Sequence, residues 1–255
     1  MHATGFCKEM WAPVVDPHLS GTAVVAFDQR GHGDSEVSLP PFDWWDLGRD
    51  ALAVADRLGG STMLGVGHSS GATALVMAEL TRPGSFPALV LIEPVVFPGP
   101  FAYVPENPMT SRALRRRSRF PSAEAAAASF RGRGPFARWT ERALAAYVTY
   151  GFRPDDGALT LKCRPEVEGE FYRGATAHGV WDRLGEVACP VVLLAGADSE
   201  SHPGAFIERQ GEQFRSATVV VVPGATHFLP MERPEAVAAE VCRVLGTLRT
   251  AGTAR

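Results

Sequence analysis

Lysine is almost absent from this 255-residue chain: Lys8 and Lys162 are the only two, and arginine carries nearly all of the positive charge. Acidic residues outnumber basic ones, and the formal net charge is −3. A chain with this balance has no overall field that would attract nucleic acid or an anionic membrane surface. We therefore expect a small-molecule substrate as partner, and neither nucleic acid nor a membrane.

Cysteine is also scarce, and the apolar runs are short. The cysteines lie far apart and form no CxxC pair: Cys7, Cys163, Cys189 and Cys242. This spacing favours reduced thiols over a disulfide framework or a zinc site. No apolar run approaches the ~18 residues that a membrane span needs, and the start has no pattern of a secretory signal. We expect a soluble, cytoplasmic protein.

Phosphate-binding loops, dinucleotide fingerprints and metal-ligand motifs are missing as well. We therefore expect the chemistry of this chain to need no cofactor and no metal.

What the sequence does contain is an alternation of short apolar runs with longer segments of helical period. The runs are near-continuous and rich in β-branched residues, at residues 22–27, 62–67, 88–92, 191–195 and 218–222. Helical spacing follows Asp43, recurs at residues 72–80 and resumes from Pro234. This pattern predicts an α/β fold: a mostly parallel sheet covered by helices on both faces.

Residues 94–184 interrupt the alternation. This stretch opens with a proline-rich segment and continues with mainly helical patterns. About ninety residues is too long for a connection between two strands. We predict that residues 94–184 form a helical cap, and that residues 1–93 and 185–255 form the core.

A candidate nucleophile lies between the second predicted strand and the helix after it, in the stretch GHSSG at residues 67–71. In a Gly-x-Ser-x-Gly turn the middle serine lies at the tip of a strained strand-to-helix turn, and its neighbours must be small. Ser69 holds that position, so we predict it to be the nucleophile. An ordinary glycine-rich turn is the alternative.

A serine hydroxyl needs a base, and the base needs an acid to orient it. His227 lies just after the last predicted strand, at the carboxyl edge of the sheet where sites of open α/β sheets gather. We predict His227 as the base. His202 is the main rival, but it precedes that strand, and His68 is adjacent to Ser69 and would point elsewhere.

Three carboxylates compete for the role of the acid. Asp198 and Glu200 follow the strand at residues 191–195, and Asp198 lies nearer to the strand end. We predict Asp198 as the acid. Glu200 is one alternative, and Glu93, at the end of the strand at residues 88–92, is another.

With these features, the chain resembles the α/β-hydrolase superfamily, in its cap-bearing, esterase-like branch. Residues 28–35, DQRGHGDS, resemble its D-x-R-G-H-G-x-S turn, in which Arg30 and His32 would be structural. Residues 2–6, HATGF, are similar to its H-G-x-x-F/W oxyanion loop, although Ala3 replaces the usual glycine. The resemblance implies that the backbone N–H groups of Thr4 and Ser70 form the oxyanion hole.

The same resemblance raises a question about the start of the chain. In that superfamily the oxyanion loop follows a central strand, which two further strands precede, and none of the three is recognisable here. The central strand would pair between residues 22–27 and 62–67. We therefore expect an N-terminally truncated version of the fold: Met1 would lie inside a longer reading frame, or the chain would be a fragment.

These features together predict a carboxylesterase-like serine hydrolase of EC class 3.1, acting through an acyl-enzyme on a carboxylic ester or lactone. Serine at the turn argues against dehalogenase or epoxide hydrolase chemistry. Aromatic residues of the predicted cap favour a small, largely apolar substrate: Phe97, Phe101, Tyr103, Trp139, Tyr147 and Trp181. The alternatives are a C–C bond hydrolase or acyltransferase with the same triad, and a non-catalytic ligand-binding protein on this scaffold.

Overall fold

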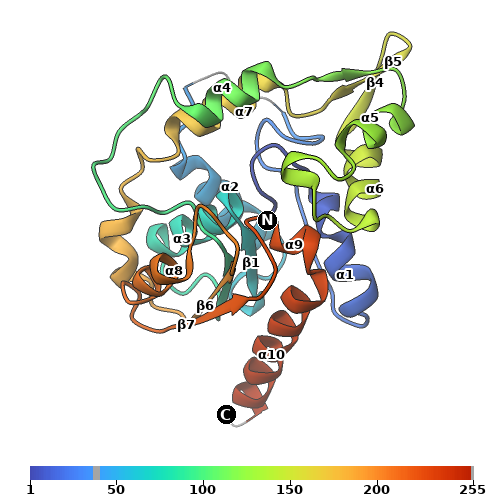
Figure 1. Cartoon of the computed structure of the whole chain (residues 1–255). Coiled ribbons are helices and arrows are strands. Elements are labelled where there is room, and N and C mark those ends of the chain that lie inside the picture. The colour runs from blue at the N-terminus through green and yellow to red at the C-terminus, as the bar shows by residue number, and fades with distance from the viewer. Residues whose placement is uncertain (37–40, 254–255) are drawn as a thin grey trace.

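A parallel four-stranded sheet forms the centre of the molecule in this computed structural model, which describes residues 1–36 and 41–253 (Figure 1). The strands are β1 (Gly65–His68), β2 (Leu89–Ile92), β6 (Val191–Gly196) and β7 (Ala217–Val222), in the order β1-β2-β6-β7. Every neighbouring pair is parallel. All four carboxyl ends therefore meet at one edge, and the predicted fold class, a mostly parallel α/β sheet, is confirmed.

The two faces of this sheet bury different apolar clusters because side chains alternate along each strand. Leu89 and Leu91 pack in one cluster, whereas Val90 and Ile92 pack in the other. The first cluster lies under α2 (Trp45–Arg57), α3 (Ser70–Thr81) and α8 (Gly204–Gly211). The second lies under α1 (Ala12–His18) and α10 (Pro234–Thr253), which extends away from the sheet in Figure 1.

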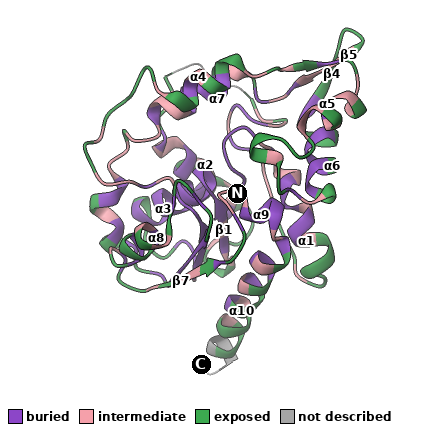
Figure 2. Cartoon of the chain, in the orientation of Figure 1, coloured by how far each residue is buried: buried purple, intermediate pink, exposed green. Residues whose placement is uncertain are grey.

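Helix α3 is the most enclosed of these helices, as the purple ribbon in Figure 2 shows. Every residue from Ser70 to Leu80 is buried. This explains why its sequence is apolar on all sides rather than on one stripe. The turn that precedes α3 is consequently fixed at the start of a buried helix in the core of the protein.

The predicted strand at residues 22–27 is wrong. These residues form no strand, and Val24 and Val25 are 43% and 48% exposed. No strand of the described residues pairs with this apolar run. The neighbour of β1 on this side is Met1, whose carbonyl accepts from the backbone N–H of His68 at 3.1 Å. A cavity of about 60 Å³ lies between Val25, Phe27 and β1.

Residues 94–184 contain more β-structure than the helical pattern predicted. Their helices are α4 (Pro108–Arg115), α5 (Ala123–Phe130), α6 (Glu141–Tyr150) and α7 (Pro165–Gly174), with short 3-10 turns η3 (Gly134–Phe136) and η4 (Val180–Glu186). Between them, β3 (Arg119–Phe120), β5 (Ala158–Leu161) and β4 (Phe152–Asp155) form a small antiparallel sheet in that order.

The turn between β4 and β5 has a sequence signal. Asp156 and Gly157 both have positive φ, 44° and 68°, as a two-residue hairpin turn of the type favoured by Asp-Gly requires. The Asp-Gly dipeptide by itself therefore predicts a hairpin at this position.

The N-terminal segment joins the cluster formed by this region. This segment contains the 3-10 turn η1 (Lys8–Trp11). Another 3-10 turn, η2 (Gly60–Thr62), lies elsewhere in the chain, just before β1. Cys7 and Met10 pack with Phe120, Tyr147 and other buried residues of the segment 94–184. Met231, from the short helix α9 (Leu229–Glu232), completes this cluster. The N-terminal segment, residues 94–184 and helix α9 therefore pack against one another.

None of the helices in the described residues is both long enough and apolar enough to cross a membrane.

Candidate active site

Ser69 is the single residue between the end of β1 and the start of α3. Its backbone has φ 55° and ψ −117°, a conformation that costs free energy in a residue with a side chain. Its N–H donates to the carbonyl of Ile92 at 2.8 Å. The turn thus lies directly beside the end of β2, and the strained backbone is held by its surroundings.

The two glycines of this turn are required by close backbone contacts. A Cβ atom on Gly67 would lie 2.6 Å from the backbone N and Cα of Ala72. A Cβ atom on Gly71 would overlap the carbonyl groups of Met1 and His2. The small residues predicted around Ser69 therefore serve two contacts: one with the helix that follows, and one with the N-terminal segment.

His227 reaches Ser69 across 158 positions of sequence: its Nε2 lies 3.1 Å from Ser69 Oγ. The residue lies in the loop between β7 and α9. Nε2–H of His68 donates to the backbone carbonyl of His227 at 2.8 Å, which ties this loop to β1. The structure therefore brings together the two side chains that the sequence analysis paired as nucleophile and base.

Glu93 contacts the other nitrogen of the same imidazole. Its Oε2 accepts from His227 Nδ1 at 2.6 Å. Glu93 follows β2 directly, has a positive φ of 44° and is fully buried. Its Oε1 accepts from the backbone N–H of Gly196 at 2.9 Å, and Ser199 Oγ donates to Oε2 at 2.7 Å.

The charge of this carboxylate is compensated inside the protein. Burial by itself would raise the pKa of Glu93, but hydrogen bonds from His202 and His227, together with the charges of these rings, hold that pKa below its ordinary value. Glu93 is therefore ionised at neutral pH and can orient the imidazole of His227.

Asp198, the predicted acid, does not contact His227. Its side chain is 47% exposed and forms an ion pair with Arg138. Glu200, the other alternative from this loop, is also exposed. The backbone after β6 turns Ser199 inward instead, so the expectation of an Asp198–His227 contact has to be corrected in favour of Glu93.

The segment around Thr4 is held by residues of the DQRGHGDS turn. His32 Nε2 accepts from the backbone N–H of Gly5 at 2.9 Å, and His2 Nε2 accepts from that of Gln29 at 3.0 Å. Arg30 forms two hydrogen bonds with Asp50, each at 2.8 Å. His32 and Arg30 thus make structural contacts, as the resemblance implied.

Two backbone N–H groups remain candidates for the oxyanion hole. Ser70 is the first residue of α3, where a backbone N–H has no acceptor within the helix. Thr4 is buried in a turn of the N-terminal segment, which packs on Gly71 through Met1 and His2. Their role as donors stays a prediction.

An aromatic cluster from three segments begins at Phe228, whose ring lies next to that of His227. Phe228 is 5.5 Å from the His227 ring, Trp139 is 5.9 Å from Phe228, and Phe6 is 5.5 Å from Trp139, measured between centroids. Trp139 comes from residues 94–184, and the N–H of the next residue, Thr140, donates to the carbonyl of Met231 at 3.0 Å. The imidazole therefore contacts this aromatic cluster through Phe228.

Beside the Ser69–His227–Glu93 chain lies a second buried histidine whose position the sequence analysis missed. His202 donates from Nε2 to the carbonyl of Pro94 at 2.9 Å, so its Nδ1 faces Ser201 Oγ at 3.0 Å and Glu93 Oε2 at 3.3 Å. The sequence pattern indicated His202 only as a rival of His227 for the role of base.

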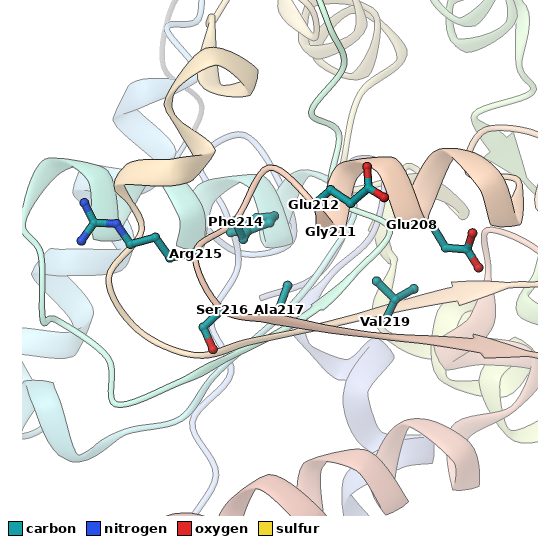
Figure 3. Close-up of a pocket in the computed structure, with 8 residues that line it drawn as sticks. All are labelled: Glu208, Gly211, Glu212, Phe214, Arg215, Ser216, Ala217 and Val219. Atoms are coloured by element: carbon teal, nitrogen blue, oxygen red, sulfur yellow. The ribbon is translucent and has the colours of Figure 1, made fainter.

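A larger hollow, of about 500 Å³, lies elsewhere, between α8 and β7 (Figure 3). Its lining includes Glu208, Glu212 and Arg215 but none of Ser69, Glu93 and His227. Figure 3 shows these charged side chains spread along the hollow rather than pointing at one another. We assign it no part in the chemistry.

Comparison with known proteins identifies the family of this chain. Type I acyl-CoA thioesterase mpaH of Penicillium roqueforti is 27% identical over 97% of this chain and 60% of its own length, so the chain spans less than two thirds of that relative. 2-(Acetamidomethylene)succinate hydrolase of Mesorhizobium japonicum is 26% identical over 83% of this chain and 74% of its own length.

The crystal structure of E-2-(acetamidomethylene)succinate hydrolase superposes with a TM-score of 0.84. At 23% identity over 96% of this chain and 89% of the other, this likeness shows the fold. The profile of the Alpha/beta hydrolase family matches residues 1–240. Because that match covers nearly the whole chain, the protein belongs to the Alpha/beta hydrolase family.

Proposed function

We propose that this protein is a serine hydrolase that cleaves an ester-like bond through a covalent acyl-enzyme. One observation carries the proposal: an unbroken hydrogen-bonded chain from Ser69 Oγ to His227 Nε2, at 3.1 Å, and from His227 Nδ1 to Glu93 Oε2, at 2.6 Å. This is the arrangement that turns a weak hydroxyl into a nucleophile.

In the first half of the reaction, Ser69 Oγ attacks the carbonyl carbon of the substrate while its proton passes to His227 Nε2. Glu93 holds the proton on Nδ1, so that Nε2 presents a lone pair to the hydroxyl, and the carboxylate stabilises the imidazolium that forms. The backbone N–H groups of Ser70 and Thr4 donate to the developing oxyanion. His227 then returns the proton to the leaving group as that group departs.

In the second half, His227 takes a proton from water, and the resulting hydroxide attacks the acyl carbon. The oxyanion collapses, Ser69 Oγ leaves, and His227 reprotonates it. The acid product is released and the site is restored. None of these steps calls for a cofactor.

The substrate we propose is a small, largely apolar carboxylic ester or lactone. The aromatic cluster of Phe6, Trp139 and Phe228, which reaches His227 through Phe228, supports this assignment. The name of the Penicillium relative specifies an acyl-CoA thioesterase, so a thioester belongs among the substrates to be tested.

We further propose that residues 94–184 act as a cap over the site, and that residues 1–93 and 185–255 form the catalytic core. The contact of Thr140 with Met231 supports this, because it connects the segment to the helix that follows His227. A cytoplasmic location is part of the proposal, and the free state of all four cysteines supports it.

The experiment is labelling with a fluorophosphonate probe, which reacts with activated serines. The wild-type protein should be labelled, and Ser69→Ala should abolish the labelling. The matched control is Ser70→Ala, which removes the neighbouring hydroxyl but retains its backbone N–H. An unlabelled wild-type protein would favour a ligand-binding role on this scaffold, and labelling that survives Ser69→Ala would show that another residue reacts.

Hydrolysis of short and long p-nitrophenyl esters, an acyl-CoA and a lactone then separates the substrate classes. A labelled enzyme that cleaves none of them but cleaves a 1,3-diketone would be a C–C bond hydrolase, and one that acts only with an alcohol acceptor would be an acyltransferase.

A further inference from the structure

Four ligand atoms converge beside the proposed catalytic chain, from Glu93, Ser201, His202 and His227. His202 Nδ1 and Ser201 Oγ lie 3.3 Å and 3.4 Å from Glu93 Oε2. Ser201 Oγ lies 3.0 Å from His202 Nδ1 and 3.4 Å from His227 Nδ1. The ligand atoms of Glu93, His202 and His227 all lie within 4.8 Å of one another.

These separations suit a tetrahedral metal ion. Ligands at 2.0–2.1 Å from a tetrahedral ion such as Zn²⁺ are separated from one another by about 3.3–3.4 Å. The 2.6 Å distance between His227 Nδ1 and Glu93 Oε2 is shorter because these atoms form a hydrogen bond. On binding of the ion, the two atoms would have to move apart by less than about 1 Å. Two imidazoles with a carboxylate are a set that Zn²⁺ and Cu²⁺ bind well.

The tautomer of His202 adds a second argument. The carbonyl of Pro94 can only accept, so it holds the proton of His202 on Nε2. In its neutral form the ring therefore turns the lone pair of Nδ1 toward Oε2 of Glu93, 3.3 Å away. A cation between these two atoms, either a proton on the ring or a metal ion, would bind to both.

We propose that a dication of the Zn²⁺ class binds between Glu93 Oε2, His202 Nδ1 and His227 Nδ1, with Ser201 Oγ or a water as fourth ligand, and that it inhibits the enzyme. The ion takes the lone pair of His227 Nδ1, so the ring proton moves to Nε2. An Nε2 that carries a proton cannot accept one from Ser69. The inhibitory part of this inference rests on the proposed function, whereas the binding of the ion does not.

Access to the site is through its exposed members. Ser201 is exposed and the side chain of His227 is 25% exposed, whereas Glu93 and His202 are buried behind them. An ion can therefore enter from solvent and be removed by a chelator without unfolding of the core.

Binding is tested by titrating Zn²⁺ into protein that carries Cys242→Ser, which removes the exposed thiol. One ion per chain should bind, and His202→Gln should weaken binding by about tenfold or more. Glutamine can still donate to Pro94. His18→Gln, the control, removes an exposed histidine and should leave the affinity unchanged. Equal affinity in the wild-type protein and His202→Gln, or no binding at all, would overturn the proposal.

Should His202→Gln not fold, Cu²⁺ bound to the wild-type protein supplies the second readout. Its electron paramagnetic resonance spectrum should show coupling to two imidazole nitrogens, and coupling to fewer would contradict the site. The Zn²⁺ titration on the Ser69→Ala variant should give the same affinity as on the wild-type protein, because Ser69 is not a ligand of the ion.

Inhibition is tested separately, as loss of fluorophosphonate labelling with Zn²⁺ and its recovery with EDTA. Labelling that persists at saturating Zn²⁺ would refute the inhibitory role. A metal-free protein that is never labelled would refute the proposed hydrolase instead, and the binding result would stand.

Discussion

Glu93 Oε2 lies 2.6 Å from Nδ1 of His227, although 134 positions of sequence separate the two residues. Glu93 directly follows β2, the strand between β1 and β6, whereas the loop after β6 carries Asp198 outward to Arg138. The carboxylate beside the imidazole therefore comes from the strand next to that of the serine.

Substitutions of Glu93 and of Asp198 should differ in their effect on the rate of ester hydrolysis. The amide in Glu93→Gln carries no negative charge to stabilise the imidazolium of His227, so kcat should fall by about three to four orders of magnitude. Asp198→Asn breaks only an exposed ion pair and should change kcat less than about threefold. Steady-state hydrolysis of a p-nitrophenyl ester measures both. A larger loss in Asp198→Asn than in Glu93→Gln would reverse the assignment of the acid.

The turn at Ser69 should be intolerant of a methyl group at Gly67. In Gly67→Ala the new Cβ would lie 2.6 Å from the backbone of Ala72, and we expect the free energy of unfolding to fall by about 1–3 kcal/mol. Gly246→Ala is the control: this site in α10 has open space around it, and the change should be neutral or stabilise the helix by up to about 1 kcal/mol. Urea unfolding measures both, and equal stabilities would contradict the close contact.

Stability should decrease as the pH falls below neutrality. Burial lowers the pKa of His2 and His68 to about 3 and that of His178 to about 4, from an ordinary value of 6.5. Between pH 6.5 and about 4 the unfolded chain binds protons that the folded chain does not, so the free energy of unfolding drops across this window. Above pH 6.5 these rings are neutral in both states and have no effect.

Urea unfolding at pH 7.5, 5.5 and 4.5 checks this dependence. His178→Gln retains a donor for the carbonyl of Val95 and should flatten the profile, whereas the exposed His18→Gln should leave it unchanged. A wild-type profile that is flat over this range would mean that the three rings are already protonated in the folded state.

Much of the fold follows from local patterns. The runs at residues 88–92 and 191–195 are apolar at every position because β2 and β6 are buried on both faces. The run at residues 22–27 has the same apolar character, but no strand within residues 1–36 and 41–253 pairs with it, and it therefore forms no strand. Apolar character alone cannot distinguish the two cases, because strand formation requires a neighbour.

The sequence by itself determined the turn around Ser69, because its requirements are local: a strand end, small residues and a helix start within a few positions. It also indicated His227, since a residue that follows the last strand must lie at the carboxyl edge of a parallel sheet. Only the tertiary structure decided between Glu93 and Asp198, and only it placed His202 beside them. The order of strands across the sheet and the direction of each loop depend on contacts between residues far apart in the chain, and no local pattern records them.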